Sequence, residues 1–192
     1  MKDDIMNFCH MLKIVLVGFI IAVYSFVFPF AFAQEVAPQA ALPTSSPVEY
    51  ALPYPGILPD HPLYIFKQLR DTILLVLITK PIRKVEFYIL LSDKKLAMGA
   101  TLLTKKKSDL ATQIAGKSIT DLEVAEKLIF EIPNGNNNEV ANVKDRFEKS
   151  VLKHEEVIAD MKTLVNDPTQ KQKLETQLTT LKTLYQNYLR KK

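Results

Sequence analysis

Hydrophobic residues recur every three or four positions along most of the chain after residue 61, and this spacing predicts helices. We expect five of them, at about residues 62–78, 81–106, 108–131, 139–165 and 168–190. Short turns separate neighbouring helices, so consecutive helices should run antiparallel. The predicted fold is all-α: a three-helix core over residues 62–131, with a long hairpin over 139–190 that packs on it through a coiled-coil-like seam.

The first of these helices is the most apolar. Its hydrophobic residues at helical spacing are Leu63, Phe66, Leu69, Ile73, Val76 and Leu77. Because its second half is apolar all round, we expect a central helix that is covered on several faces. A helix lying on a membrane surface is the alternative interpretation.

The third helix leaves its continuity open. Gly116 and the capping-box pattern of Thr120 and Glu123 could divide the segment 108–131 into two helices. The apolar spacing continues across both positions, so one unbroken helix remains the other possibility.

A proline-rich stretch, LPYPGILPDHPLY, precedes the first helix. Proline denies this stretch helical hydrogen bonds, while its tyrosine and aliphatic side chains favour burial. We therefore expect residues 50–61 to form an ordered, extended arm that packs on the helices. Asp60 is expected to cap the first helix, with Pro62 in its first turn, and Asp167, before Pro168, is expected to cap the last helix.

The N-terminal 33 residues have the pattern of an export signal. Lys13 precedes an apolar run without charged residues over 14–33, which ends in Ala31-Phe32-Ala33. This pattern predicts a signal peptide cleaved between Ala33 and Gln34. The run is also long enough for an uncleaved membrane anchor. Both interpretations place the rest of the chain outside the cytoplasm, and a start at Met11 would give a more typical leader.

Residues 34–49 are rich in Ala, Pro, Ser and Gln, which predicts a flexible linker. Beyond residue 33 the chain has 23 Lys and Arg against 19 Asp and Glu. The two signs are mixed along the helices, so we expect no nucleic-acid partner.

Candidate chemistry is sparse. The single cysteine, Cys9, precedes the apolar run, which leaves no disulfide or thiol chemistry beyond it. His61 and His154 have no neighbouring carboxylates at metal-binding spacing, so we expect no metal and no cofactor. Ser92 and Lys95 match the S-x-x-K pattern of serine enzymes, but the partner motifs are missing. The sequence therefore predicts a protein that is not an enzyme.

A recurrent motif runs through the proline-rich stretch and the first two predicted helices: Pro55, Gly56, Leu58, Pro59, Pro62, Leu63, Tyr64, Lys67, Arg70, Asp71, Asp93, Lys95, Leu96 and Ala97. Through these residues, the segment 50–130 resembles an uncharacterised domain family of exported or membrane-anchored proteins, a domain of unknown function numbered 5667. The resemblance implies an exported helical domain and carries over no catalytic residue.

The charged residues of this motif suggest a structural role. Lys67, Arg70 and Asp71 lie at helical spacing, and Asp93 and Lys95 recur in the second helix. We expect them to form interhelical ion pairs. Two functions remain open: a structural or interaction module that binds an envelope protein or itself, or a module whose lysines bind a membrane surface or an anionic polymer.

Overall fold

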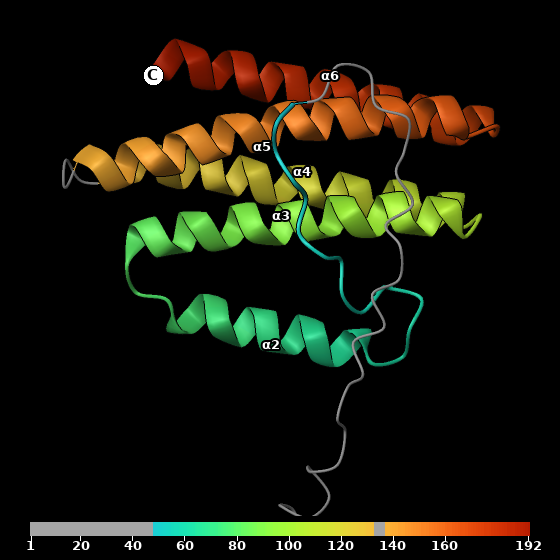
Figure 1. Ribbon diagram of the computed structural model, residues 1–192, viewed down its shortest axis with the longest axis horizontal. Helices are drawn as coiled ribbons and strands as arrows, with labels where there is room; N and C mark the ends of the chain where they lie inside the picture. The colour runs from blue at the N-terminus through green and yellow to red at the C-terminus, as the bar shows by residue number, and fades with distance from the viewer. Residues whose placement is uncertain (1–47, 133–136) are drawn as a thin grey trace, which may run out of the picture. The chain divides into compact units, whose positions relative to one another are not determined.

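The computed structural model describes residues 48–132 and 137–192. Within these ranges the chain forms five α-helices and no strand, which confirms the all-α prediction (Figure 1). The helices are α2 (Tyr64–Leu77), α3 (Pro81–Thr104), α4 (Ser108–Glu131), α5 (Asn137–Leu164) and α6 (Pro168–Lys191). The predicted signal or anchor segment and most of the predicted linker lie outside the described residues.

Four helices enclose the hydrophobic core. Helix α3 packs on α4 and α5, and α6 packs on α4 and α5. Each helix runs opposite to its neighbours in the chain (Figure 1). The largest fully buried side chains include Ile89, Leu96, Leu122, Phe147 and Tyr188. Among the described residues the buried core extends from Leu58 to Tyr188, so residues 34–192 include it.

Helices α3 and α4 approach each other closely at a glycine. A Cβ atom at Gly99 would lie 3.1 Å from the carbonyl oxygen of Ala111, tighter than most such contacts. Helix α4 also continues without a break through Gly116 and Thr120, so the open question about its continuity is settled in favour of one helix.

The predicted caps have different outcomes. The Asp167 side chain accepts a hydrogen bond from the Thr169 amide at 2.7 Å, which confirms the predicted N-cap of α6. The predicted cap at Asp60 is wrong, because α2 begins only at Tyr64, beyond the reach of that side chain. Asp60 instead accepts a hydrogen bond from the Lys107 ammonium at 2.8 Å, and this bond lowers the pKa of Asp60.

Residues 48–63, the lead-in segment, precede α2 and contact other helices. The Val48 amide donates to the Glu156 carboxylate at 3.2 Å, and the Tyr50 hydroxyl donates to the Asp93 carboxylate at 2.5 Å. Leu58 is buried, whereas Tyr54 remains 61% exposed.

Candidate functional site

Helix α2 reverses the usual arrangement of a bundle helix: charged side chains lie on its less exposed face, and apolar side chains lie on its exposed face. Its less exposed positions are Tyr64, Lys67, Asp71, Leu75 and the C-cap Ile78, and they define its inner face. Two of these five side chains are charged. No residue of α2 is buried.

The outer face of α2 consists of Ile65, Phe66, Leu69, Ile73, Val76 and Leu77. These side chains are between 50% and 78% exposed, although all six are large and apolar. Soluble monomers rarely expose a contiguous apolar patch of this kind unless something binds it. The outer face is therefore the strongest candidate for a binding surface in the described part of the chain.

The prediction of a central helix covered on several faces is wrong. Phe66, Leu69 and Val76 were expected to point into the core, yet the structure turns them outward. On the inner face, Tyr64 is partly buried and packs against the core cluster.

The positive charge of the chain is concentrated at α2 and the start of α3. Beyond residue 33 the chain has 23 basic and 19 acidic residues. Five of the basic residues and one of the acidic residues lie within 61–85, so 18 of each sign lie elsewhere. The five are Lys67, Arg70, Lys80, Arg83 and Lys84. The apolar outer face and the net positive charge thus occupy the same short segment.

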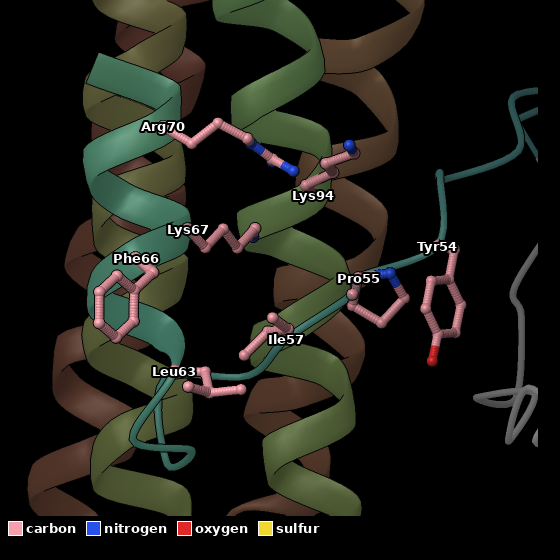
Figure 2. A pocket seen from close by; sticks show the side chains of 9 residues that line it. Tyr54, Pro55, Ile57, Leu63, Phe66, Lys67, Arg70 and Lys94 are labelled. Atoms are coloured by element: carbon pink, nitrogen blue, oxygen red, sulfur yellow. The ribbon is translucent and has the colours of Figure 1, made fainter. Parts of the chain in front are cut away.

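A pocket of about 600 Å³ lies beside this surface, between α2, the lead-in segment and α3 (Figure 2). Its lining residues are Tyr54, Pro55, Gly56, Ile57, Leu63, Phe66, Lys67, Arg70 and Lys94. Gly56 has a φ of +71°, so a residue with a side chain would be strained at this turn. The lining contains three basic side chains and no acidic one.

Lys67 extends from α2 toward α3 (Figure 2). Its ammonium lies 3.6 Å from the Met98 sulfur and 5.6 Å from the centre of the Tyr64 ring, and no carboxylate in the described ranges lies within ion-pair distance. Burial lowers the pKa of Lys67 to about 8, against the opposing effect of Asp71; the nearby Lys94, Arg70 and Lys95 also lower it.

The expected interhelical ion pairs are present at only part of the motif. Lys95 on α3 donates to Asp121 on α4 at 2.6 Å. Arg70, by contrast, pairs with its own neighbour Asp71 at 2.7 Å, within α2. Lys67 forms no ion pair among the described residues.

A second group of polar side chains is buried between α3 and α5. Asp93 accepts hydrogen bonds from the Ser150 hydroxyl at 2.6 Å and from the Tyr50 hydroxyl at 2.5 Å. Burial raises the pKa of Tyr50 to about 12, with the Asp93 charge adding to the shift. An Arg146 nitrogen lies 4.0 Å from Asp93. Asp93 thus joins the lead-in segment to two helices.

The His154 ring completes this group. Its Nδ1 lies 2.8 Å from the Ser150 carbonyl oxygen and therefore carries the hydrogen in the neutral ring, while Nε2 lies 2.8 Å from the Ser92 hydroxyl. The single Ser92 hydrogen serves either Nε2 or the Ser118 carbonyl oxygen at 2.7 Å. Burial lowers the pKa of His154, although Asp93 opposes the shift.

Ser92 and His154 are both 0% exposed, so no substrate reaches this serine–histidine pair in the closed fold. The described residues also contain no group of three side chains suited to a metal ion. Sequence reasoning identified Asp93 and His154 but missed Ser150 and Tyr50 as their partners. Ser150 lies four residues before His154 on the same stripe of α5, and this spacing was the available signal.

The remaining motif residues lie in the lead-in segment and on α3. Pro55 and Gly56 line the pocket, Leu58 is buried, and Pro59 follows it. Pro62 lies in the turn before α2, and Leu96 is fully buried. The structure thus distributes the motif between the pocket and the core. The predicted cleavage residues Ala31, Ala33 and Gln34 lie outside the described ranges.

The family model for a domain of unknown function, DUF5667, matches residues 56–182. The chain belongs to the DUF5667 family. No curated protein and no solved structure matches it. The DUF5667 match extends well beyond the resemblance at 50–130 and includes α5 and most of α6. It therefore covers the outer face of α2, the buried pair of Ser92 and His154, and the pocket except for Tyr54 and Pro55.

Proposed function

We propose that this DUF5667 domain is an exported, non-enzymatic helical module that binds the surface of an anionic membrane through α2. The observation that carries the proposal is the exposed apolar outer face of α2, in the segment that holds the net positive charge of the chain beyond residue 33. An apolar face flanked by Lys and Arg is the pattern of helices that lie in the headgroup region of a bilayer.

The length of α2 favours a helix in the plane of the membrane. Its 14 residues extend about 21 Å, which is shorter than the roughly 30 Å of a bilayer core. None of the described helices is long and apolar enough to cross a membrane.

Charge favours a bilayer over a second copy of this chain. A two-fold dimer through the outer face would place the same surface against itself. Residues 61–85 carry five basic side chains and one acidic one, so the two copies would repel each other. Anionic headgroups remove this repulsion and add attraction, while the acyl region accepts the apolar side chains.

The buried Ser92 and His154 support a role without catalysis. A nucleophile needs contact with its substrate, and both side chains lie in the interior. The export part of the proposal rests on the uncharged run over 14–33. If that run stays in the membrane, the 14 residues from 34 to 47 reach roughly 50 Å at most, which keeps α2 near the bilayer.

Vesicle cosedimentation of residues 34–192 tests the proposal, since this fragment contains the whole core. We expect binding to phosphatidylglycerol-containing vesicles that weakens with salt, and little binding to pure phosphatidylcholine. Leu69→Asp, at a side chain 56% exposed on α2, should reduce binding at least about tenfold, because a charge enters the apolar face.

Leu189→Asp is the matched control, because Leu189 is 48% exposed on α6. It should bind as the wild type does, and circular dichroism should show both variants folded. Absence of wild-type binding to anionic vesicles would overturn the proposal. Capture of an envelope protein that Leu69→Asp abolishes, without vesicle binding, would assign the outer face to a protein partner.

A further inference from the structure

The pocket beside α2 has an excess of positive charge that the protein itself does not balance. Lys67 and Lys94 form no ion pair within the described ranges, and Arg70 pairs only with Asp71, which does not line the pocket. Some lysines elsewhere do have carboxylate partners: Lys107 binds Asp60, and Lys191 binds Glu126. Burial lowers the pKa of Lys67, and the charges of Lys94 and Arg70 add to that shift.

The three cations line the same pocket from two helices. Figure 2 shows Lys67 and Arg70 extending from α2 toward α3, and Lys94 extending from α3 on the side away from α2. Repulsion from Lys94 and Arg70 contributes to the lowered pKa of Lys67, which places the three charges within interaction range. An anion in this space would be attracted by all three.

The other wall of the pocket is apolar. Phe66 from α2 and Ile57 and Leu63 from the lead-in segment lie at the end away from Arg70 and Lys94 (Figure 2). These side chains are between 39% and 68% exposed, so a ligand that covered them would remove apolar surface from water. The pocket therefore combines an anion site with an adjoining apolar surface.

We propose that this pocket binds a phosphate-bearing lipid, with the phosphate between Lys67, Arg70 and Lys94 and the start of an acyl chain along Leu63, Phe66 and Ile57. Arg and Lys side chains are the usual protein ligands of phosphate oxygens. The volume of about 600 Å³ falls within the range of small-molecule sites and suits a headgroup with the first part of its chain.

This inference deepens the proposed membrane function, because it names the headgroup that the module would recognise. It makes a separate claim, however, since the pocket is distinct from the outer face of α2 except at Phe66. An experiment can therefore refute lipid binding in the pocket without refuting membrane binding by α2, and the reverse.

The test uses a short-chain lipid that stays monomeric, so that no bilayer is present. Residues 34–192 are titrated with dihexanoyl phosphatidic acid, dihexanoyl phosphatidylcholine or inorganic phosphate, and amide NMR shifts report binding. We expect saturable binding of phosphatidic acid with shifts at the pocket, weaker binding of inorganic phosphate, and weaker binding of the zwitterionic lipid.

Lys67→Gln and Lys94→Gln should each weaken phosphatidic acid binding about tenfold, because each removes one charged contact. Lys117→Gln, at an exposed lysine on α4, makes the same charge change and should leave binding intact. Burial destabilises the charged form of Lys67, so we expect the fold to tolerate its replacement by a neutral side chain in Lys67→Gln.

Each outcome has a defined meaning. Equal binding by wild type, Lys67→Gln and Lys94→Gln would overturn the pocket, as would inorganic phosphate binding as tightly as phosphatidic acid. Vesicle binding without binding of the monomeric lipid would refute the pocket while the membrane function stands. Binding of the monomeric lipid without vesicle binding would support the pocket and refute the membrane function.

Discussion

At the scale of single residues, Asp93 is the acceptor that connects the lead-in segment with α3 and α5. It is 0% exposed and accepts from both Ser150 and Tyr50. A buried carboxylate needs such donors, because an unpaired charge in the interior is costly. The structure therefore predicts that the Tyr50 hydroxyl stabilises the whole fold as well as its own segment.

Tyr50→Phe should lower the free energy of unfolding by about 1–2 kcal/mol, since it removes a hydrogen bond to a charged, buried group. Tyr54→Phe is the control: Tyr54 is 61% exposed and forms no hydrogen bond within the described ranges, so its variant should match the wild type. Urea denaturation of residues 34–192 measures both. Equal loss in the two variants, or none in Tyr50→Phe, would contradict the assigned bond.

His154 predicts a dependence of stability on pH. Burial lowers the pKa of His154 below its value in the unfolded chain, and the charge of Asp93 on α3 opposes this shift. Arg146 on α5 and Tyr50 both lie beside Asp93. Between the folded and unfolded pKa values the unfolded chain binds more protons. Stability is therefore complete above about pH 6.5 and is lost as the pH falls through the folded pKa.

Denaturation at a series of pH values tests this histidine. The wild type should lose stability below about pH 6.5, whereas His154→Gln should be less stable at neutral pH but change less across this range. His61→Gln is the matched control, because His61 is exposed and should leave the wild-type profile unchanged. A His154→Gln profile parallel to the wild type would show that another group causes the acid sensitivity.

At the scale of elements, the positions of the helices followed from the sequence, whereas the orientation of α2 did not. Hydrophobic spacing marked all five helices, and proline and Asp167 marked the start of α6. Spacing shows which side chains favour burial but does not show what buries them. For α2 the more apolar face is the outer one, so the assumption that it faces the core of the same molecule failed.

Two local sequence patterns typical of helix caps do not form caps in the structure. Thr120 and Glu123 have the spacing of a capping box, yet α4 continues because its apolar stripe packs on α3 throughout. Asp60 has the right residue type for a cap, but the turn before Tyr64 places it near Lys107. Tertiary contacts decided both cases.

The outer face of α2 can be tested with a single fluorophore, because the chain contains no tryptophan. A tryptophan replacing Val76, which is 78% exposed, should shift its emission to shorter wavelength when anionic vesicles are added, since the ring leaves water. Leu189→Trp on α6 should show no shift. Identical responses at the two positions would mean that α2 does not face the bilayer.

At the scale of the whole molecule, the nearly balanced numbers of basic and acidic residues concealed an excess of basic residues within 61–85. Because the two signs are mixed along the helices, the sequence predicted no nucleic-acid partner. Beyond residue 33, the residues outside 61–85 carry 18 basic and 18 acidic side chains, so the excess of positive charge lies within 61–85. The buried polar pairs were likewise beyond reach, because Ser92 and His154 are 62 positions apart.

The final prediction concerns where the protein is held if it is exported as proposed. If cleavage occurs after Ala33, the mature chain should begin at Gln34, and α2 alone would hold it on the membrane. It should then be released by high salt or alkaline carbonate, and Leu69→Asp should move it to the soluble fraction while Leu189→Asp does not. N-terminal sequencing and fractionation measure both features. A full-length, carbonate-resistant protein would instead show that residues 14–33 anchor the chain, and Leu69→Asp would then leave its fractionation unchanged.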